Sequence, residues 1–255
     1  MTTSNDPTKI YVCVYRHVQP NQHELRHVTA AAQRDPRMKR FLDEYQRADS
    51  YLDWGDDPSF FSAFTQFGDF TRAAWGVCRR DVRGSLVLGD AVAFICAKFL
   101  PDTRRREYYY VGCGTVGHLI SDRRRIWNDD AYTSLREYLN ILAQPDMRGR
   151  LRNIEVFPEH KDWQRRAEQP YVLFDPDRTA FNVISPHLFA TFEPSNGVSE
   201  RWCPDTVSSE LRRLFFTRTR QHLKTSLHRN QHPKLRIHGE PHRLADVRDR
   251  LVEMA

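Results

Sequence analysis

The sequence feature that most constrains the fold is a pair of apolar segments, residues 91–97 and 108–116, joined by a short charged loop. Both segments are rich in β-branched and aromatic residues, which is typical of strands. The loop between them is too short for the helix that a parallel crossover requires. We therefore predict an antiparallel pair of strands, with a further short strand at residues 74–78 in the same meander.

Other segments complete the pattern of an α+β protein. Residues 9–18 and 171–192 are rich in strand-forming residues. Apolar residues recur at helical spacing in three segments, residues 21–50, 129–143 and 205–227. Asp35-Pro36 is predicted to separate two N-terminal helices, because the residue before a proline disfavours the helical conformation. The aromatic, acidic residues 51–70 are interpreted as a packed loop.

Composition narrows the class of protein. The chain has 255 residues, 40% of them hydrophobic, so it can bury a sizeable core. No apolar run approaches the roughly 20 residues of a membrane span, and the polar N-terminus lacks the apolar region of a secretion signal. The five cysteines form no CxxC pair, which favours a reducing compartment. We therefore expect a cytoplasmic protein without a membrane partner.

A glycine motif raises one alternative. Gly112-Cys-Gly114-Thr-Val-Gly117 has the GxGxxG pattern and follows a predicted strand, as in dinucleotide-binding folds. Residues 118–125 carry no helical apolar stripe, however, and the preceding strand pairs naturally with residues 91–97. We therefore interpret the glycines as part of a twisted or bulged strand in a small barrel, and keep dinucleotide binding as a second alternative.

Several short motifs follow one another in a recognisable order. They are Pro58-Ser-Phe-Phe61, Gly76-Val-Cys78-Arg79, Val82-Arg83, Leu88-Gly-Asp90, Tyr109-Tyr-Val-Gly-Cys-Gly-Thr-Val116 and, later, Phe181-Asn-Val-Ile-Ser185 with Leu188-Phe189. This order resembles the nucleotide-modification-associated domains of the second and third types, and more generally the PUA-like barrels that include the EVE and YTH domains. The resemblance implies a PUA-like antiparallel β-barrel core with flanking helices. It also implies a role near modified bases, in phage DNA hypermodification or in bacterial systems that sense it.

This fold would occupy residues 1–200, with an N-terminal helical insertion, and residues 201–255 would form a basic helical extension. Proteins that hold an extruded base use aromatic faces and a few hydrogen bonds to its polar edge. The candidate base-binding residues are Trp75, Asp90, Phe94 and Tyr109. Ordinary core packing for the aromatic residues, and a turn-stabilising role for Asp90, are the competing interpretations.

Clusters of arginine flank the turns of the meander. Arginines at such a rim commonly contact phosphates, and the candidate phosphate-binding residues are Arg79, Arg80, Arg83, Arg104, Arg105, Arg123 and Arg124. Acidic residues instead gather within residues 43–69, so the modest net charge of +6 hides a separation of charge. A solvated face of an arginine-rich protein is the competing interpretation.

These observations favour a nucleic-acid-binding protein that recognises a modified or extruded base and is associated with DNA base modification or defence. DNA is preferred over RNA as the partner. The first alternative is an enzyme acting on a nucleotide or modified base, with Asp90 and Glu107 near its pocket. A cross-strand salt bridge between Lys98 and Glu107 explains the presence of Glu107 more simply. No catalytic residue, metal site or cofactor is predicted, because the usual enzyme motifs are absent and His228 and His232 lack further ligands.

Overall fold

A computed structural model provides the fold. It describes residues 10–16, 26, 29–36, 38–39, 42–43, 74–76, 79–100, 102–154, 162–181, 187–193 and 234–235. The predicted packed loop at 51–70, the predicted helix at 205–227 and most of the basic extension lie outside these residues. None of the helices within them is long and apolar enough to cross a membrane.

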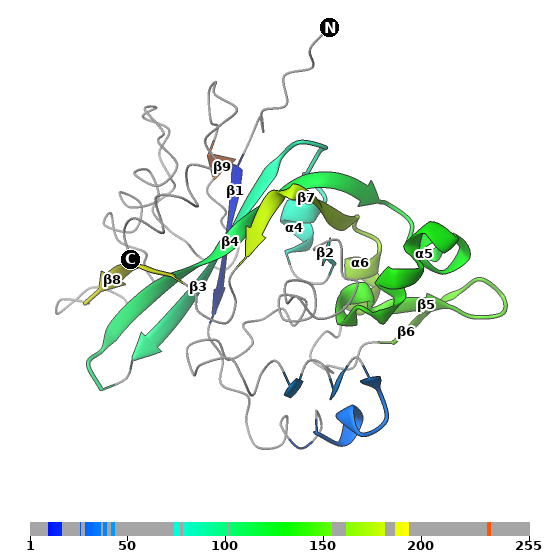
Figure 1. Ribbon diagram of the computed structural model, residues 1–255, viewed down its shortest axis with the longest axis horizontal. Coiled ribbons are helices and arrows are strands. Elements are labelled where there is room, and N and C mark those ends of the chain that lie inside the picture. The colour runs from blue at the N-terminus through cyan, green and yellow to red at the C-terminus, as the bar shows by residue number, and fades with distance from the viewer. Residues whose placement is uncertain are drawn as a thin grey trace, which may run out of the picture.

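The fold is mixed α+β, built on a seven-stranded sheet with the order β2-β7-β4-β3-β1-β9, in which β8 also pairs with β4 (Figure 1). The strands of this sheet are β1 (Ile10–Arg16), β2 (Ala74–Trp75), β3 (Ala91–Leu100), β4 (Arg105–Ile120), β7 (Tyr171–Phe181), β8 (His187–Phe192) and β9 (Lys234–Leu235). A separate hairpin pairs β5 (Ala143–Pro145) with β6 (Leu151–Asn153). The helices are α4 (Arg80–Arg83), α5 (Arg124–Asn128), α6 (Trp163–Ala167) and the 3-10 helices η1 (Asp130–Glu137) and η2 (Leu139–Ile141).

The predicted antiparallel pair is confirmed: β3 and β4 pair in antiparallel register, with Lys98 opposite Glu107. The place of the short strand in the same meander is wrong, because β2 pairs with β7 and not with β3. The strands predicted at residues 9–18, 74–78 and 171–192 are also present. The sequence did not indicate that β1 pairs with β3 in parallel. Along the described strands the sheet is mostly antiparallel and its path does not close, because the end strands β2 and β9 are not paired with each other.

The sheet is nevertheless strongly curved. Two strands, β7 and β4, separate β2 from β3 in the sheet order, yet the rings of Trp75 on β2 and Phe94 on β3 meet edge to face with centroids 5.2 Å apart. Phe94 packs in the same manner on Phe174 of β7, at 5.9 Å. These three buried rings fill the concave side of the sheet and form its aromatic core.

The glycine motif lies inside the long strand β4. Neighbouring groups approach two of its glycines closely: a Cβ on Gly114 would lie 2.6 Å from the Phe174 ring, and one on Gly117 would lie 3.0 Å from the backbone nitrogen of Asp175. Since β4 continues to Ile120, no helix begins after the third glycine, and the strand-to-helix turn that holds a pyrophosphate is absent there. The predicted bulged strand is confirmed by shifts of register along β4.

The helical segments partly match their predictions. Within the described residues of segment 21–50, helical residues occur on both sides of a break at residues 33–35, as Asp35-Pro36 indicated. Segment 129–143 forms the two 3-10 helices instead of one α-helix. Its predicted apolar face is buried all the same: Tyr132, Leu135 and Tyr138 belong to a core cluster beneath α5.

A buried arginine ties this second core together. Arg123, at the turn between β4 and α5, is fully buried. Its Nη1 donates hydrogen bonds to the carbonyl oxygens of Asn140 (3.2 Å) and Ile141 (2.7 Å), and its Nη2 donates to that of Gly76. Its guanidinium also lies over the ring of Tyr171, 4.6 Å from the centroid. One side chain thus joins the residue after β2, η2 and β7.

The tip of the β5–β6 hairpin is held by one carboxylate. Asp146 Oδ1 accepts hydrogen bonds from the backbone nitrogens of Arg148 (2.8 Å) and Arg150 (2.9 Å). The hydrogen bond from the Arg150 backbone nitrogen has the largest effect and lowers the pKa of Asp146. Partial burial raises this pKa, but the bond from Arg148 lowers it again, so the pKa stays below its usual 3.8. The stabilisation by this carboxylate is therefore complete above pH 3.8 and is lost as the pH falls below that value.

We accordingly expect the Asp146 carboxyl to titrate below 3.8 in carbon-detected NMR, with the amide signals of Arg148 and Arg150 moving at the same midpoint. In Asp146→Asn, which keeps the acceptor oxygen but cannot ionise, these two amide signals should no longer respond to acid. A carboxyl midpoint at or above 3.8 would contradict the assigned hydrogen bonds.

Candidate functional site

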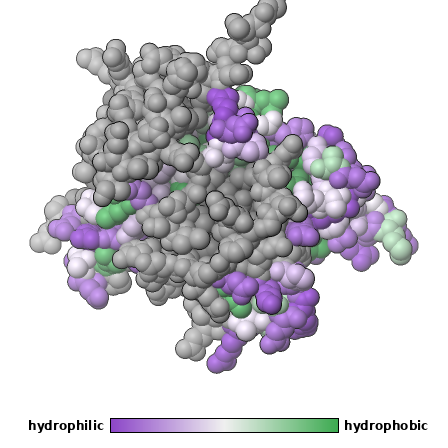
Figure 2. All heavy atoms as spheres, in the orientation of Figure 1, coloured by the Kyte–Doolittle hydropathy of each residue, from purple (hydrophilic) through white to green (hydrophobic). Residues whose placement is uncertain are grey.

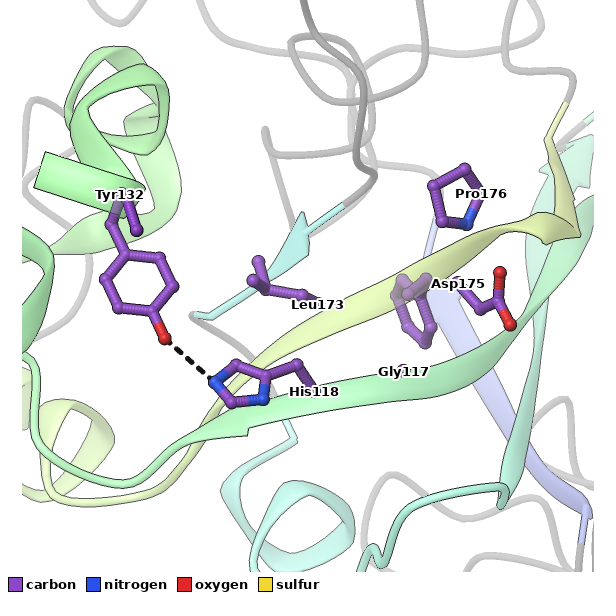
Figure 3. Close-up of a pocket in the computed structure, with 8 residues that line it drawn as sticks. Gly117, His118, Tyr132, Leu173, Asp175 and Pro176 are labelled. Atoms are coloured by element: carbon purple, nitrogen blue, oxygen red, sulfur yellow. Dashed lines mark hydrogen bonds between the residues drawn. The ribbon is translucent and has the colours of Figure 1, made fainter.

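A pocket of about 500 Å³ opens where β4, β7 and η1 meet. Its walls include Gly117 and His118 of β4, Tyr132 of η1, and Phe174, Asp175 and Pro176 of β7 (Figure 3). Its volume falls in the range of small-molecule sites, which are concave and mostly apolar with a few polar groups. The pocket is therefore large enough for a planar heterocycle.

An irregularity in the pairing of β4 with β7 creates one edge of this pocket. Gly114 pairs with Thr179 and Val116 pairs with Phe174, so the single residue Thr115 faces residues 175–178. This wide bulge contains Pro176, which has no backbone N–H to donate to a strand. Bulges re-aim side chains and often occur beside functional sites, and here the bulge carries Asp175 and Pro176 to the pocket.

A polar aromatic pair forms the opposite wall. The hydroxyl of Tyr132 and Nε2 of His118 are hydrogen-bonded at 2.9 Å, and Figure 3 shows the tyrosine reaching from η1 to the histidine on β4. The two rings are nearly parallel, with an interplanar angle of 21° and centroids 6.1 Å apart. The guanidinium of Arg125 lies over the Tyr132 ring, 5.8 Å from its centroid. Each ring therefore holds the other in place.

Asp175 is the one carboxylate among the lining residues. Its Oδ1 accepts a hydrogen bond from the backbone nitrogen of Asp177 at 3.1 Å, which orients the side chain. An ionised carboxylate only accepts hydrogen bonds, and it has more acceptor positions than this single bond uses. The pocket thus combines aromatic and apolar walls with an acceptor for an N–H group of a ligand.

The residues predicted to bind a base have other positions. Trp75 and Phe94 are fully buried in the aromatic core, where Trp75 packs on Phe94 and Phe94 packs on the pocket residue Phe174. Asp90 is also buried, and its Oδ2 accepts a hydrogen bond from the backbone nitrogen of Val87 at 3.1 Å. This bond is the turn-stabilising interaction that competes with a base-binding role for Asp90.

Tyr109 lies toward the other end of β4, in a buried polar cluster. Its hydroxyl donates a hydrogen bond to Glu107, which also accepts one from Arg105. Burial alone would raise the pKa of Glu107, but the bonds from Arg105 and Tyr109 outweigh it and hold that pKa below its usual value. Glu107 is thus ionised and paired. The structure does not bring it together with Asp90, which binds the backbone near Val116.

The predicted phosphate-binding arginines fall into two groups. Arg83 is buried, like Arg123, and donates to the carbonyl oxygens of Gln169, Pro170 and Arg166. A phosphate could reach either guanidinium only if these internal bonds were broken. The other five, which are partly or fully exposed, are Arg79, Arg80, Arg104, Arg105 and Arg124.

Of these five arginines, only Arg124 lies in the short segment that joins β4 to η1 beside the pocket. Its neighbour Arg125 contacts the pocket residue Tyr132. Arg104 and Arg105 are at the β3–β4 turn, close to Glu107. Arg79 and Arg80 belong to the α4 region, where Arg80 faces Asp162 at 3.8 Å. The structure therefore distributes the predicted phosphate contacts over several separate places.

Sequence reasoning missed His118, Tyr132 and Asp175. His118 follows the glycine motif, and Tyr132 belongs to segment 129–143, whose spacing indicates only an apolar helix face. A usable signal was present in Asp175-Pro-Asp177, because a proline within a strand-like run indicates a bulge or an edge.

In comparisons with protein-family models, with curated proteins and with solved structures, no match to this chain was found.

Proposed function

We propose that this protein binds nucleic acid and holds one unstacked base in the pocket between β4, β7 and η1. The observation that carries the proposal is the composition of that pocket: aromatic side chains, a carboxylate acceptor and a volume of about 500 Å³. Proteins that read an extruded base use stacking together with hydrogen bonds to its polar edge. Asp175 would accept from an exocyclic amine, and Tyr132 would supply an aromatic face.

Exposed arginines beside the pocket support the proposal. Arg124 and Arg125 of α5 are about half exposed, at 47% and 55% of their side-chain surface. Figure 2 shows hydrophilic residues gathered over α5 and the β5–β6 hairpin. Arginines at such positions would contact backbone phosphates without reading sequence.

The finer assignments form part of the same proposal. A PUA-like barrel is supported by the curvature of a mostly antiparallel sheet and by the bulges in β4. A role with modified DNA bases rests on the order of motifs along residues 58–116. A cytoplasmic location is supported by Cys13 and Cys113, which are buried and form no disulfide.

The test compares two carboxylates of the same bulged segment. Asp175 lines the pocket, whereas Asp177 is exposed and does not line it. Asp175→Asn and Asp177→Asn remove the same charge, so both change the long-range attraction of a polyanion equally. We expect Asp175→Asn to weaken binding of a single-stranded oligonucleotide containing adenine or cytosine by about tenfold relative to Asp177→Asn, since the amide oxygen is a neutral and weaker acceptor than the carboxylate and the amide nitrogen is a donor.

Fluorescence anisotropy at several salt concentrations gives both affinity and salt dependence. A steep fall of affinity with salt is expected, because phosphate contacts release counterions. If the two variants bind the oligonucleotide with equal affinity, Asp175 does not contact the base. Absence of saturable binding to both single-stranded and duplex DNA would contradict the proposed function.

A further inference from the structure

A second hollow, of about 630 Å³, lies beside the turn that follows β4. Ser121 and Arg124 line it from that turn, Arg150 from the β5–β6 hairpin, and Trp163, Gln164 and Glu168 from α6 and the residue after it. Figure 1 shows α5 and the hairpin side by side at this end of the fold. The hollow is separate from the base pocket, with which it shares no lining residue.

Arg150 is held in place through its backbone. Its backbone nitrogen donates to Asp146 and its carbonyl accepts from the Asp146 nitrogen at 2.8 Å, so the hairpin tip is closed on both sides. Its guanidinium, by contrast, bonds to none of the described residues. A guanidinium offers donors in a planar fork that matches the oxygens of a phosphate.

Arg124 is aimed at the same hollow by two internal bonds. Its Nε donates to the carbonyl oxygen of Gly149 at 2.9 Å, which joins α5 to the hairpin tip. Its Nη1 is bonded to the carboxylate of Asp122 at 3.3 Å. Across the described part of the chain Nη2 has no acceptor, so one edge of this guanidinium remains available while the other edge fixes its position.

The other lining groups suit a phosphate ester. The hydroxyl of Ser121 and the amide of Gln164 can add neutral hydrogen bonds, and Trp163, which is partly exposed, offers an aromatic face for an attached organic group. Asp122 is already paired with Arg124. Glu168 is exposed, and within the described residues its carboxylate has no ion-pair partner, so it is the one unneutralised negative charge facing the two arginines.

We infer that this hollow is a phosphate-binding site, in which Arg150 and Arg124 bind the phosphoryl oxygens. The inference rests on the proposed function where the phosphate belongs to nucleic acid, either to a terminal phosphate or to the backbone. The site itself is defined by the chemistry of a phosphoryl group, so inorganic phosphate alone is a sufficient probe of it.

The experiment uses inorganic phosphate, followed by the amide and arginine side-chain signals in NMR, with two matched variants. Arg150→Gln removes a guanidinium that lines the hollow, whereas Arg148→Gln removes another exposed arginine of the same hairpin that does not line it. We expect Arg150→Gln to weaken phosphate binding about tenfold and Arg148→Gln to leave it within about twofold. Glu168→Gln, which removes the opposing charge, should tighten binding roughly threefold.

Oligonucleotides with a 5′-phosphate or a 5′-hydroxyl then distinguish the source of the phosphate. A loss in Arg150→Gln confined to the 5′-phosphorylated strand supports a terminal phosphate, and an equal loss with both strands supports a backbone phosphate. Equal effects of Arg148→Gln and Arg150→Gln on inorganic phosphate, or no saturable response to it, would overturn the inference. Asp175→Asn reports on the base pocket alone, so the failure of the proposed function is distinguishable from the failure of this site.

Discussion

Replacing Arg123 by methionine is expected to lower the free energy of unfolding by about 3–5 kcal/mol, because three buried carbonyl groups lose their donor. The arginine bonds to Gly76, Asn140 and Ile141 and stacks on Tyr171. Asn140 in turn donates to the carbonyl of Ala74 at 2.9 Å. The loss therefore reaches β2 and η2 together, and thermal unfolding should occur roughly 10 °C lower for a chain of this size.

Two comparisons separate this network from a general effect of removing charge. Arg125→Gln changes a half-exposed arginine of the same run, and surface substitutions of this kind usually alter stability by about 0.5 kcal/mol or less. Arg123→Lys keeps the charge but not the planar set of donors, and it should recover only part of the loss. A methionine variant as stable as the native protein would contradict the buried network.

Replacing Trp75 by alanine is the second large effect, a loss of about 3–5 kcal/mol, as for other fully buried aromatic residues. The indole is fully buried against Phe94, and its Nε1 has no hydrogen-bond partner among the residues that the structure describes. Trp75→Phe keeps an aromatic ring without that N–H, so it should cost less than about 1.5 kcal/mol. Chemical denaturation of the three proteins measures these differences.

The Trp75 variants also distinguish a core residue from a ligand-binding residue. If Trp75 stacked directly on a base, Trp75→Phe would retain much of the binding and Trp75→Ala would lose binding while unfolding normally. A position in the aromatic core predicts instead that Trp75→Ala loses stability, and that its binding is lost only because the protein unfolds. A Trp75→Ala protein of native stability that no longer binds oligonucleotides would show that Trp75 contacts the base directly.

The strands could be predicted because their signals are local. Segments 91–97 and 108–116 carry enough β-branched and aromatic residues to indicate strands, and their short loop fixes an antiparallel pair. The parallel contact of β1 with β3 joins segments some eighty residues apart, and no local pattern specifies such a partner. The sequence likewise does not indicate the 3-10 form of segment 129–143, because burial of Tyr132 and Leu135 produces the same spacing in either kind of helix.

The site was harder to predict because residue type does not reveal burial. Arg83 and Arg123 belong to arginine-rich runs that resemble a phosphate-binding rim, yet both guanidinium groups are used inside the protein. Arg80 and Arg124 belong to the same arginine-rich runs, and both are exposed. An arginine is used inside the protein where backbone carbonyl oxygens that need a donor lie nearby. These carbonyl groups belong to segments distant in the sequence, such as those of Gly76 and Pro170.

Photochemical crosslinking tests the central claim most directly. A single-stranded oligonucleotide with one 5-iodo-2′-deoxycytidine, which keeps the exocyclic amine, is irradiated in complex with the protein. It forms a bond only to a residue in contact with that base, and tryptic peptides then locate it. We predict adducts in the peptides spanning residues 107–123 and 126–136, which contain His118 and Tyr132. Adducts confined to other peptides, with binding intact, would contradict a base pocket between β4, β7 and η1.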